Sequence, residues 1–245
     1  MFAAGQISPS AIVSLFGSEF APAGTFRQAG AADIQNNQAP RILEGVCVLF
    51  GATRAALFLL TPKQINLQVP VTDTIGTLAV RVVKNCGGQN ELTSNTLNVT
   101  AQAATPEFFS FKLNADGRNP VAAVNAVSGE LIGRVSQIGG GTFVPAKPGE
   151  YLTVYATGFG ATDPPVPAGE LATGAARVTA NVRVRLGIVD LDAADILYAG
   201  VAPFNAGLYQ LSIRVPESTP TGDLPLVVTI GSVSSPGGSY VAVEP

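Results

Sequence analysis

Residues 64–70 read QINLQVP, and residues 210–216 read QLSIRVP. In both stretches apolar and polar residues alternate, which is the period-2 pattern of a half-buried β-strand. Each stretch ends in a proline, which cannot donate to a β-ladder, and a glycine follows at the same distance in both. The next strand-like stretches also match, LAVRV at 78–82 and LPLVV at 224–228. A strand, a turn and a second strand are therefore repeated within the chain.

Two further matches occur in the same order along the chain. Residues 8–20 (SPSAIVSLFGSEF) align with 147–159 (KPGEYLTVYATGF), and residues 46–51 (VCVLFG) align with 182–187 (VRVRLG). Three ordered matches indicate two copies of one fold. Many short strands without a long helical period predict an all-β protein with little helix. We predict two tandem immunoglobulin-like β-sandwich domains.

The expected domain bounds are 1–104 for the first sandwich and 105–245 for the second. The second includes a strand-rich connection at 105–146, which interrupts the repeat. Within it, residues 108–111 (FFSF) and 121–124 (VAAV) are predicted strands, because such apolar clusters are costly to leave in water. A plain linker is the alternative.

The composition excludes several classes of partner. Charged residues make up 13% of the chain against about 25% in an average globular protein. The net charge is −3 and no run of Lys or Arg occurs, so nucleic acid is not an expected partner. No stretch approaches the ~20 apolar residues of a membrane span. Residues 1–5 (MFAAG) contain no export signal, and we expect a secreted or cell-surface protein whose leader is not present in this chain.

The chain has two cysteines, and each belongs to a strand-like stretch. A Cys47–Cys86 disulfide would close a loop of about 40 residues and could stabilise the fold by roughly 3–4 kcal/mol. Two buried thiols are the alternative, because free cysteine is commonly buried. The low charge and the many turns favour an oxidising compartment.

Catalytic and metal-binding patterns are weak. The chain contains no histidine, so it cannot form a Ser-His-Asp or Cys-His constellation. Asp190, Asp192 and Asp195 are clustered as in a calcium site but lack the EF-hand spacing, and a solvated loop is expected instead. Asp116 and Asp163 are expected in turns and not as a glycosidase pair. No enzyme activity, cofactor site or metal site is predicted.

The remaining candidates also have structural explanations. The aromatic residues Phe16, Phe20, Tyr155 and Phe159 could form a ligand platform, but strand alternation places most of them in the core. The glycine-rich stretches at 139–141 (GGG) and 158–160 (GFG) lack the lysine and the Ser/Thr of a phosphate loop and are predicted turns. Residues 98–100 (NVT) fit a glycosylation acceptor, a pattern that is common by chance.

Six stretches together resemble an uncharacterised C-terminal domain family of secreted Acidobacteria proteins of the Solibacter type. They are 7–17, 64–70, 105–109 (TPEFF), 119–126 (NPVAAVNA), 145–160 (PAKPGEYLTVYATGFG) and 197–216. The resemblance covers nearly the whole chain. It implies a tandem Ig-like or IPT-like appendage of exported proteins, with no assigned activity and no catalytic residues, and it implies that Cys47 and Cys86 pair. Such domains usually follow a long N-terminal region, whereas these 245 residues are almost entirely the repeated region.

These observations favour a non-catalytic extracellular structural or adhesive module. Hydrophobic residues make up 47% of the chain, and large apolar patches usually mark contact surfaces. Open sheet edges offer a route to self-association into a surface assembly or filament. The alternative is a carbohydrate-binding module, although the chain has no tryptophan for a sugar platform. A partner protein or glycan at the cell surface is expected in either case.

Overall fold

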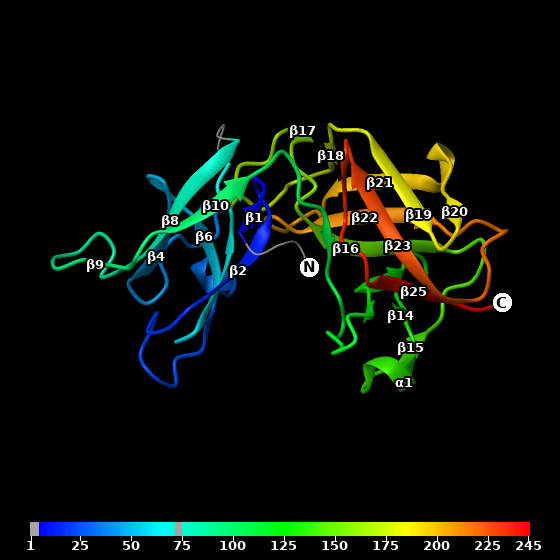
Figure 1. Ribbon diagram of the computed structural model, residues 1–245, viewed down its shortest axis with the longest axis horizontal. Helices are drawn as coiled ribbons and strands as arrows, with labels where there is room; N and C mark the ends of the chain where they lie inside the picture. The colour runs from blue at the N-terminus through cyan, green and yellow to red at the C-terminus, as the bar shows by residue number, and fades with distance from the viewer. Residues whose placement is uncertain (1–4, 72–74) are drawn as a thin grey trace.

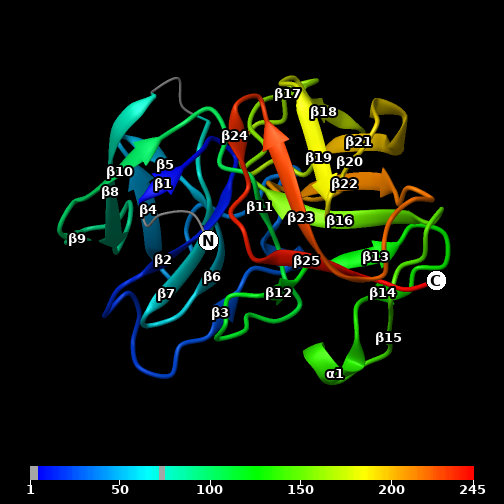
Figure 2. The ribbon, with the colours of Figure 1, turned by 45° about the vertical axis from the view of Figure 1, so that its right-hand side comes forward.

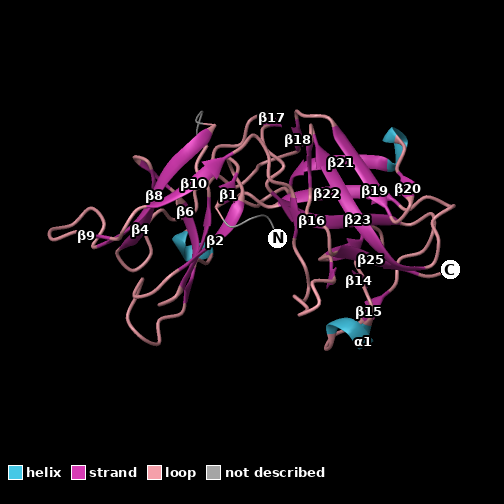
Figure 3. Cartoon of the chain, viewed as in Figure 1, coloured by secondary structure: helices cyan, strands magenta, loops and turns pink. Residues whose placement is uncertain are grey.

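The computed structural model describes residues 5–71 and 75–245, and its regular structure is almost entirely β-strand (Figure 3). The helical elements within these residues are one short α-helix and two single 3-10 turns. They are α1 (Val135–Ile138), η1 (Ala31–Asp33) and η2 (Ala193–Asp195). The prediction of an all-β fold with little helix is confirmed.

Two sheets form the N-terminal part, which we call the N-terminal sheet pair. Sheet 1 has the order β2-β7-β6-β3, and sheet 2 has the order β1-β10-β8-β4-β5 with β9 paired to β8. The bounds in sheet 1 are β2 Ile12–Phe16, β3 Arg27–Gln28, β6 Ala56–Leu60 and β7 Gln64–Gln68. The bounds in sheet 2 are β1 Gln6–Ile7, β4 Val46–Phe50, β5 Thr53–Arg54, β8 Gly76–Lys84, β9 Leu92–Thr93 and β10 Leu97–Ala101.

Two larger sheets form the C-terminal sheet pair. Sheet 3 has the order β15-β14-β13-β16-β22-β21-β18-β17 with β11 also on β16, and sheet 4 has the order β12-β25-β23-β19-β20 with β24 on β23. The bounds in sheet 3 are β11 Glu107–Phe108, β13 Ala123–Asn125, β14 Leu131–Ile132, β15 Phe143–Val144, β16 Tyr151–Thr157, β17 Thr162–Asp163, β18 Ala176–Val178, β21 Ile196–Val201 and β22 Tyr209–Arg214. The bounds in sheet 4 are β12 Asn119–Pro120, β19 Val182–Leu186, β20 Val189–Asp190, β23 Gly222–Ile230, β24 Val233–Ser234 and β25 Ser239–Val243.

A hydrophobic cluster lies between the two sheets of each pair. In the N-terminal pair, Leu67 of sheet 1 and Val48 and Val82 of sheet 2 are buried in the same cluster. In the C-terminal pair, Leu211 of sheet 3 and Val228 of sheet 4 are buried together. Figure 1 shows the two pairs side by side along the long axis, and Figure 2 shows them from another angle. The apolar half of each alternating strand supplies these clusters.

Strand pairing is equivalent in the two sheet pairs. Ile12 pairs with Gln68 between β2 and β7, and Tyr151 pairs with Arg214 between β16 and β22. In sheets 2 and 4, Val46↔Lys84 corresponds to Val182↔Ile230. In every case, the sequence alignment places each partner on its counterpart. The matched stretches therefore occupy the same positions and the same register.

The two sheet pairs also share a serine-to-backbone hydrogen-bond pattern, although the serines lie outside the aligned stretches. The amide of Val82 donates to the Ser94 hydroxyl at 3.0 Å, and the amide of Val228 donates to the Ser235 hydroxyl at 3.1 Å. In both places the serine amide donates back to the same residue's carbonyl. Ser94 and Ser235 therefore hold equivalent turns at the edges of sheets 2 and 4.

The 105–146 segment contains strands, but not over the predicted ranges. Strand β11 covers Glu107–Phe108, and its continuation is a single bridge between Ser110 and Val121. The stretch predicted at 121–124 is divided between that bridge and β13. The two segments bond to each other, because Phe111 N–H donates to Pro120 O and Ala122 N–H donates to Phe109 O. They form a hairpin that lies against β16 and β25.

The two sheet pairs are joined by direct hydrogen bonds. Gln68 is 1% exposed, and its side chain accepts from Gly169 N–H at 2.7 Å and donates to Ser10 O at 3.2 Å. Nearby, the amide of Ala39 also donates to the carbonyl of Gly169 at 2.7 Å. A β-carbon at Gly207 would lie 2.7 Å from Gln68 Nε2, so this glycine allows the close approach.

Candidate binding groove

Strand β2 lies at the edge of sheet 1. Among the described residues, its neighbour in the sheet is β7 alone. The amide of Gly17 and the carbonyl of Ala11 bond toward β7, which fixes the alternation of the ladder. The N–H and C=O groups of Ile12, Ser14 and Phe16 therefore point away from β7. An edge of this kind is a template for another strand.

A groove of about 550 Å³ runs beside this edge, and we call it the β2 groove. It is lined by β2, the following turn, β8, β9 and the start of β10. Its apolar lining includes Leu15, Phe20, Val80, Val82 and Leu97. Three large apolar residues of the lining are exposed: Phe16 by 71%, Leu92 by 58% and Leu97 by 45%. The groove therefore leaves apolar surface next to unpaired backbone groups.

The equivalent edge in the C-terminal sheet pair is covered. Strand β16 corresponds to β2, and both β11 and β13 pair with its outer edge. The amide of Tyr155 donates to Ala122 O at 2.9 Å, and the amide of Phe109 donates to Tyr155 O at 3.0 Å. Phe108 of β11 is 6% exposed and belongs to the core cluster. The hairpin of the 105–146 segment thus completes this side of the C-terminal pair.

Burial along the two strands reflects this difference. Phe16, Gly17, Ser18 and Glu19 are all exposed. Their counterparts, residues 155–158, are half-buried at Tyr155 and buried at the other three positions. Within the described residues, the same stretch is therefore exposed in the N-terminal sheet pair and covered in the C-terminal one.

At both ends of the open edge, a side chain bonds to a backbone group that a neighbouring strand could otherwise pair with. At one end, the Thr157 hydroxyl accepts from Ile12 N–H at 2.7 Å. At the other end, the Lys84 ammonium donates to Glu19 O at 3.1 Å. The counterpart of that carbonyl, Gly158 O, accepts from the amide of Thr105. Lys84 therefore bonds to the backbone carbonyl whose counterpart in the C-terminal pair accepts from the covering segment.

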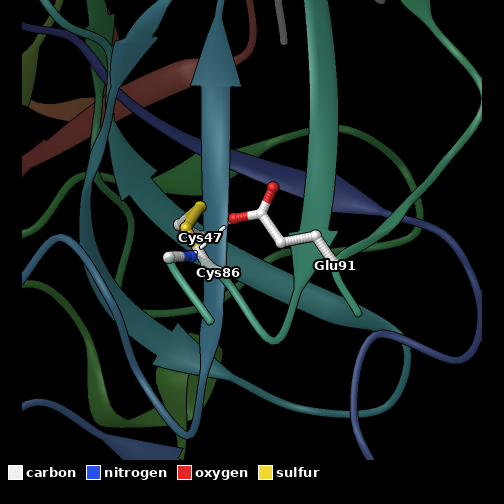
Figure 4. Close-up of a disulfide and its surroundings, with 4 residues drawn as sticks. Cys47, Cys86 and Glu91 are labelled. Carbon is white, nitrogen blue, oxygen red and sulfur yellow. Dashed lines mark hydrogen bonds between the residues drawn. A yellow bond between two sulfur atoms is a disulfide. The ribbon is translucent and has the colours of Figure 1, made fainter. Parts of the chain in front are cut away.

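Cys47 and Cys86 form a disulfide with a Cα–Cα distance of 5.9 Å. Cys47 is fully buried in β4, and Cys86 lies two residues after the end of β8, so the bond links β4 to the turn that follows its neighbouring strand in sheet 2. Figure 4 shows the Glu91 side chain beside the bond, where its carboxylate accepts from Gly87 N–H at 2.5 Å. The disulfide is a structural link in the same sheet that lines the β2 groove.

The structure separates the carboxylates of the weak calcium candidate. Asp190 lies in β20, and the two hydrogen bonds from Arg185 lower the pKa of its carboxyl. Asp192 precedes η2, and Asp195 ends it with an oxygen 3.9 Å from Arg214. Within residues 5–71 and 75–245, no group of three or more potential metal-ligating side chains occurs. Asp190 therefore serves as an ion-pair partner in a strand and not in the expected loop.

The other sequence candidates are spread over the molecule. Asp116 lies in the predicted turn and accepts from the amide of Arg118, whereas Asp163 lies in strand β17 and not in a turn. Asn98 is an exposed residue of β10. The glycine run at 139–141 follows α1, and the run at 158–160 follows β16.

The four candidate aromatic residues do not form one platform. Phe20 and Phe159 are buried, and Phe159 packs against Tyr209 with ring centroids 5.4 Å apart. Tyr155 is half-buried on β16, the strand with which the hairpin pairs. Phe16 departs from the prediction of a core position: its neighbour Leu15 packs against the core cluster, so Phe16 points to the outer face of sheet 1 and is 71% exposed. The sequence did not show this, because Leu15 and Phe16 are both apolar and alternation does not tell which of the two faces the core.

No protein-family model matches the chain, and no curated protein resembles it in sequence. Across the part of the chain that the structure describes, no helix is long and apolar enough to cross a membrane.

Proposed function

We propose that the protein is a non-catalytic structural or adhesive module of the cell surface or of the secreted fraction. It consists of two immunoglobulin-like sandwich domains, 1–104 and 105–245, and it associates through the β2 groove with another polypeptide, a second copy of itself included. The equivalent strand registers support the interpretation that the chain contains two copies of one fold. The disulfide and the family resemblance support an exported location.

One observation carries this proposal: no strand of residues 5–71 or 75–245 pairs with the outer edge of β2, while its counterpart β16 is covered by strands of the same chain. Apolar side chains beside an unpaired strand favour association, because burial of apolar area contributes roughly 25 cal/mol per Å². Phe16, Leu92 and Leu97 place such area at the rim of the groove.

Size-exclusion chromatography with light scattering, together with negative-stain electron microscopy, tests the proposal. We expect concentration-dependent oligomers or filaments from the native chain. The variant Phe16→Ser is expected to shift the population to monomers. Phe26→Ser is the matched control, because Phe26 is 72% exposed but does not line the β2 groove, and it should behave as the native chain does. A monodisperse monomer of the native chain at high concentration would contradict self-association.

The alternative function is carbohydrate binding. Exposed aromatic rings at Phe16, Phe26 and Phe204 favour it, because sugars stack on such rings. A glycan array of the native chain tests this alternative, and it predicts binding that is lost when one of these rings is replaced by serine. An array without a hit would exclude it for the glycans displayed.

A further inference from the structure

We infer that the β2 groove takes an inserted polypeptide strand donated by a partner chain. The strand runs antiparallel to β2, and it places an aromatic side chain opposite Gly17 and an acidic side chain opposite Ser18. This inference rests on the proposed use of the groove as a contact surface. It specifies what the groove binds: an extended segment, and not the face of a folded sheet.

The direction and register follow from the counterpart in the C-terminal sheet pair. There β11 is antiparallel to β16, with Glu107 opposite Thr157 and Phe108 opposite Ala156. The alignment of the two copies places Ala156 on Gly17 and Thr157 on Ser18. A strand in the β2 groove therefore has its aromatic residue opposite Gly17 and its acidic residue opposite Ser18.

The groove can accept the aromatic ring. Paired residues of an antiparallel ladder project to the same face, so the ring opposite Gly17 would project toward the space between sheets 1 and 2. Phe20 packs over Gly17 so closely that a β-carbon there would lie 2.4 Å from its Cζ. The incoming ring thus meets an aromatic side chain and the apolar residues Val80 and Val82 of β8.

Backbone bonding at the edge is also complementary to such a strand. Ser14 and Phe16 point their N–H and C=O groups outward, which is what strand addition requires. The Lys84 ammonium lies on the carbonyl of Glu19, next to Ser18. It would be released when a strand amide takes that carbonyl, as the amide of Thr105 does at Gly158 O in the C-terminal pair.

The edge begins beside an existing contact with the C-terminal sheet pair. At Ile12 the outward amide already bonds to Thr157 of the C-terminal sheet pair. The free part of β2 therefore begins where that contact ends, at Ser14. A short strand of the length of β11, and not a long one, fits the remaining edge.

The test uses a fluorescein-labelled synthetic peptide with the sequence of residues 104–112 (ATPEFFSFK), because this stretch fills the counterpart site. Fluorescence anisotropy with the full chain is expected to show saturable binding. N-methylation of the amide that corresponds to Phe109 removes the bond to the carbonyl of Phe16, and should weaken binding at least about tenfold. N-methylation at the preceding residue is the matched control, because that amide points away from the edge, and it should leave the affinity unchanged.

Two outcomes would overturn the inference. One is no binding of the peptide by a chain that remains folded, and the other is equal binding of both N-methylated peptides. Neither outcome bears on oligomers seen by light scattering, which would then form by contact between folded surfaces. Conversely, a strictly monomeric chain that binds the peptide with the expected pattern would refute self-association and support strand insertion.

Discussion

At the scale of single residues, the disulfide is the strongest covalent constraint on the N-terminal sheet pair. Cys47 and Cys86 are 39 residues apart in sequence, and a cross-link of this separation restricts the unfolded chain considerably. We predict that the double variant Cys47→Ala/Cys86→Ala is less stable by about 3–4 kcal/mol in the free energy of unfolding. Guanidinium titration measures this difference.

Reduction supplies the control for this prediction. A reductant should lower the stability of the native chain by a similar amount and leave the double variant unchanged. A double variant within about 1 kcal/mol of the native chain would show that the cross-link contributes little.

Tyr209 gives a pH-dependent prediction. It is buried, burial raises the pKa of its phenol, and its hydroxyl donates to Gly160 O at 2.5 Å. The unfolded phenol ionises near pH ~10, while the folded one keeps its proton. Stability from this group is therefore complete below pH ~10 and is lost as the pH rises toward the folded pKa.

The variant Tyr209→Phe separates the effect of the hydrogen bond from the effect of phenol ionisation. Near neutral pH it should be less stable by about 1 kcal/mol, because the hydrogen bond to Gly160 is lost. Between pH ~9 and ~11 this deficit should shrink, because phenylalanine does not ionise. Urea titrations of both proteins over this range measure the difference, and a deficit that stays constant would contradict the proposed titration of Tyr209.

At the scale of elements, β2 and β16 show how one strand pattern gives two different environments. Both strands alternate in the same register against β7 and β22. The covering hairpin is present in the C-terminal pair alone, as far as the described residues extend. Phe16 and Tyr155 both point to the outer face of their sheets, because Leu15 and Val154 beside them face the core. The covering hairpin accounts for the difference between them: Tyr155 is half-buried and Phe16 is exposed.

Proline substitutions test which amides of β2 point outward. The amide of Ser14 points away from β7, so Ser14→Pro should fold with stability within about 1 kcal/mol of the native chain. The amide of Leu15 points toward β7, and Leu15→Pro should lose about 3 kcal/mol or more. Thermal unfolding followed by circular dichroism measures both. Equal destabilisation by the two substitutions would mean that the Ser14 amide is bonded.

Sequence reasoning predicted much of the fold because strand alternation and turn residues are local signals. It predicted strands that are equivalent in the two copies, such as 64–68 and 210–214, and it singled out Cys47 and Cys86. It did not predict the β2 groove, because the groove depends on which distant segments cover an edge. The role of 105–146 as a cover was missed for the same reason, since its pairing with β16 is long-range.

At the scale of the whole molecule, buried polar contacts hold the two sheet pairs together. Gln68→Leu leaves the amide of Gly169 without its partner at a buried site, so it should cost about 1–3 kcal/mol in the free energy of unfolding. Gln64→Leu is the control, because Gln64 is only half-buried on the same strand, and its effect should stay within about 0.5 kcal/mol. Equal effects would show that the Gln68 contact does not stabilise the junction.

The two sheet pairs match in their strand registers, and they differ in the cover on one strand edge. Residue-resolved amide exchange of the monomeric chain tests this difference, by comparison of Phe16 with its counterpart Tyr155. The amide of Tyr155 bonds to Ala122 O and should be protected, whereas the amide of Phe16 should exchange nearly as fast as in an unfolded chain. Similar strong protection of both amides in the monomer would show that the β2 edge is already covered and cannot take another strand.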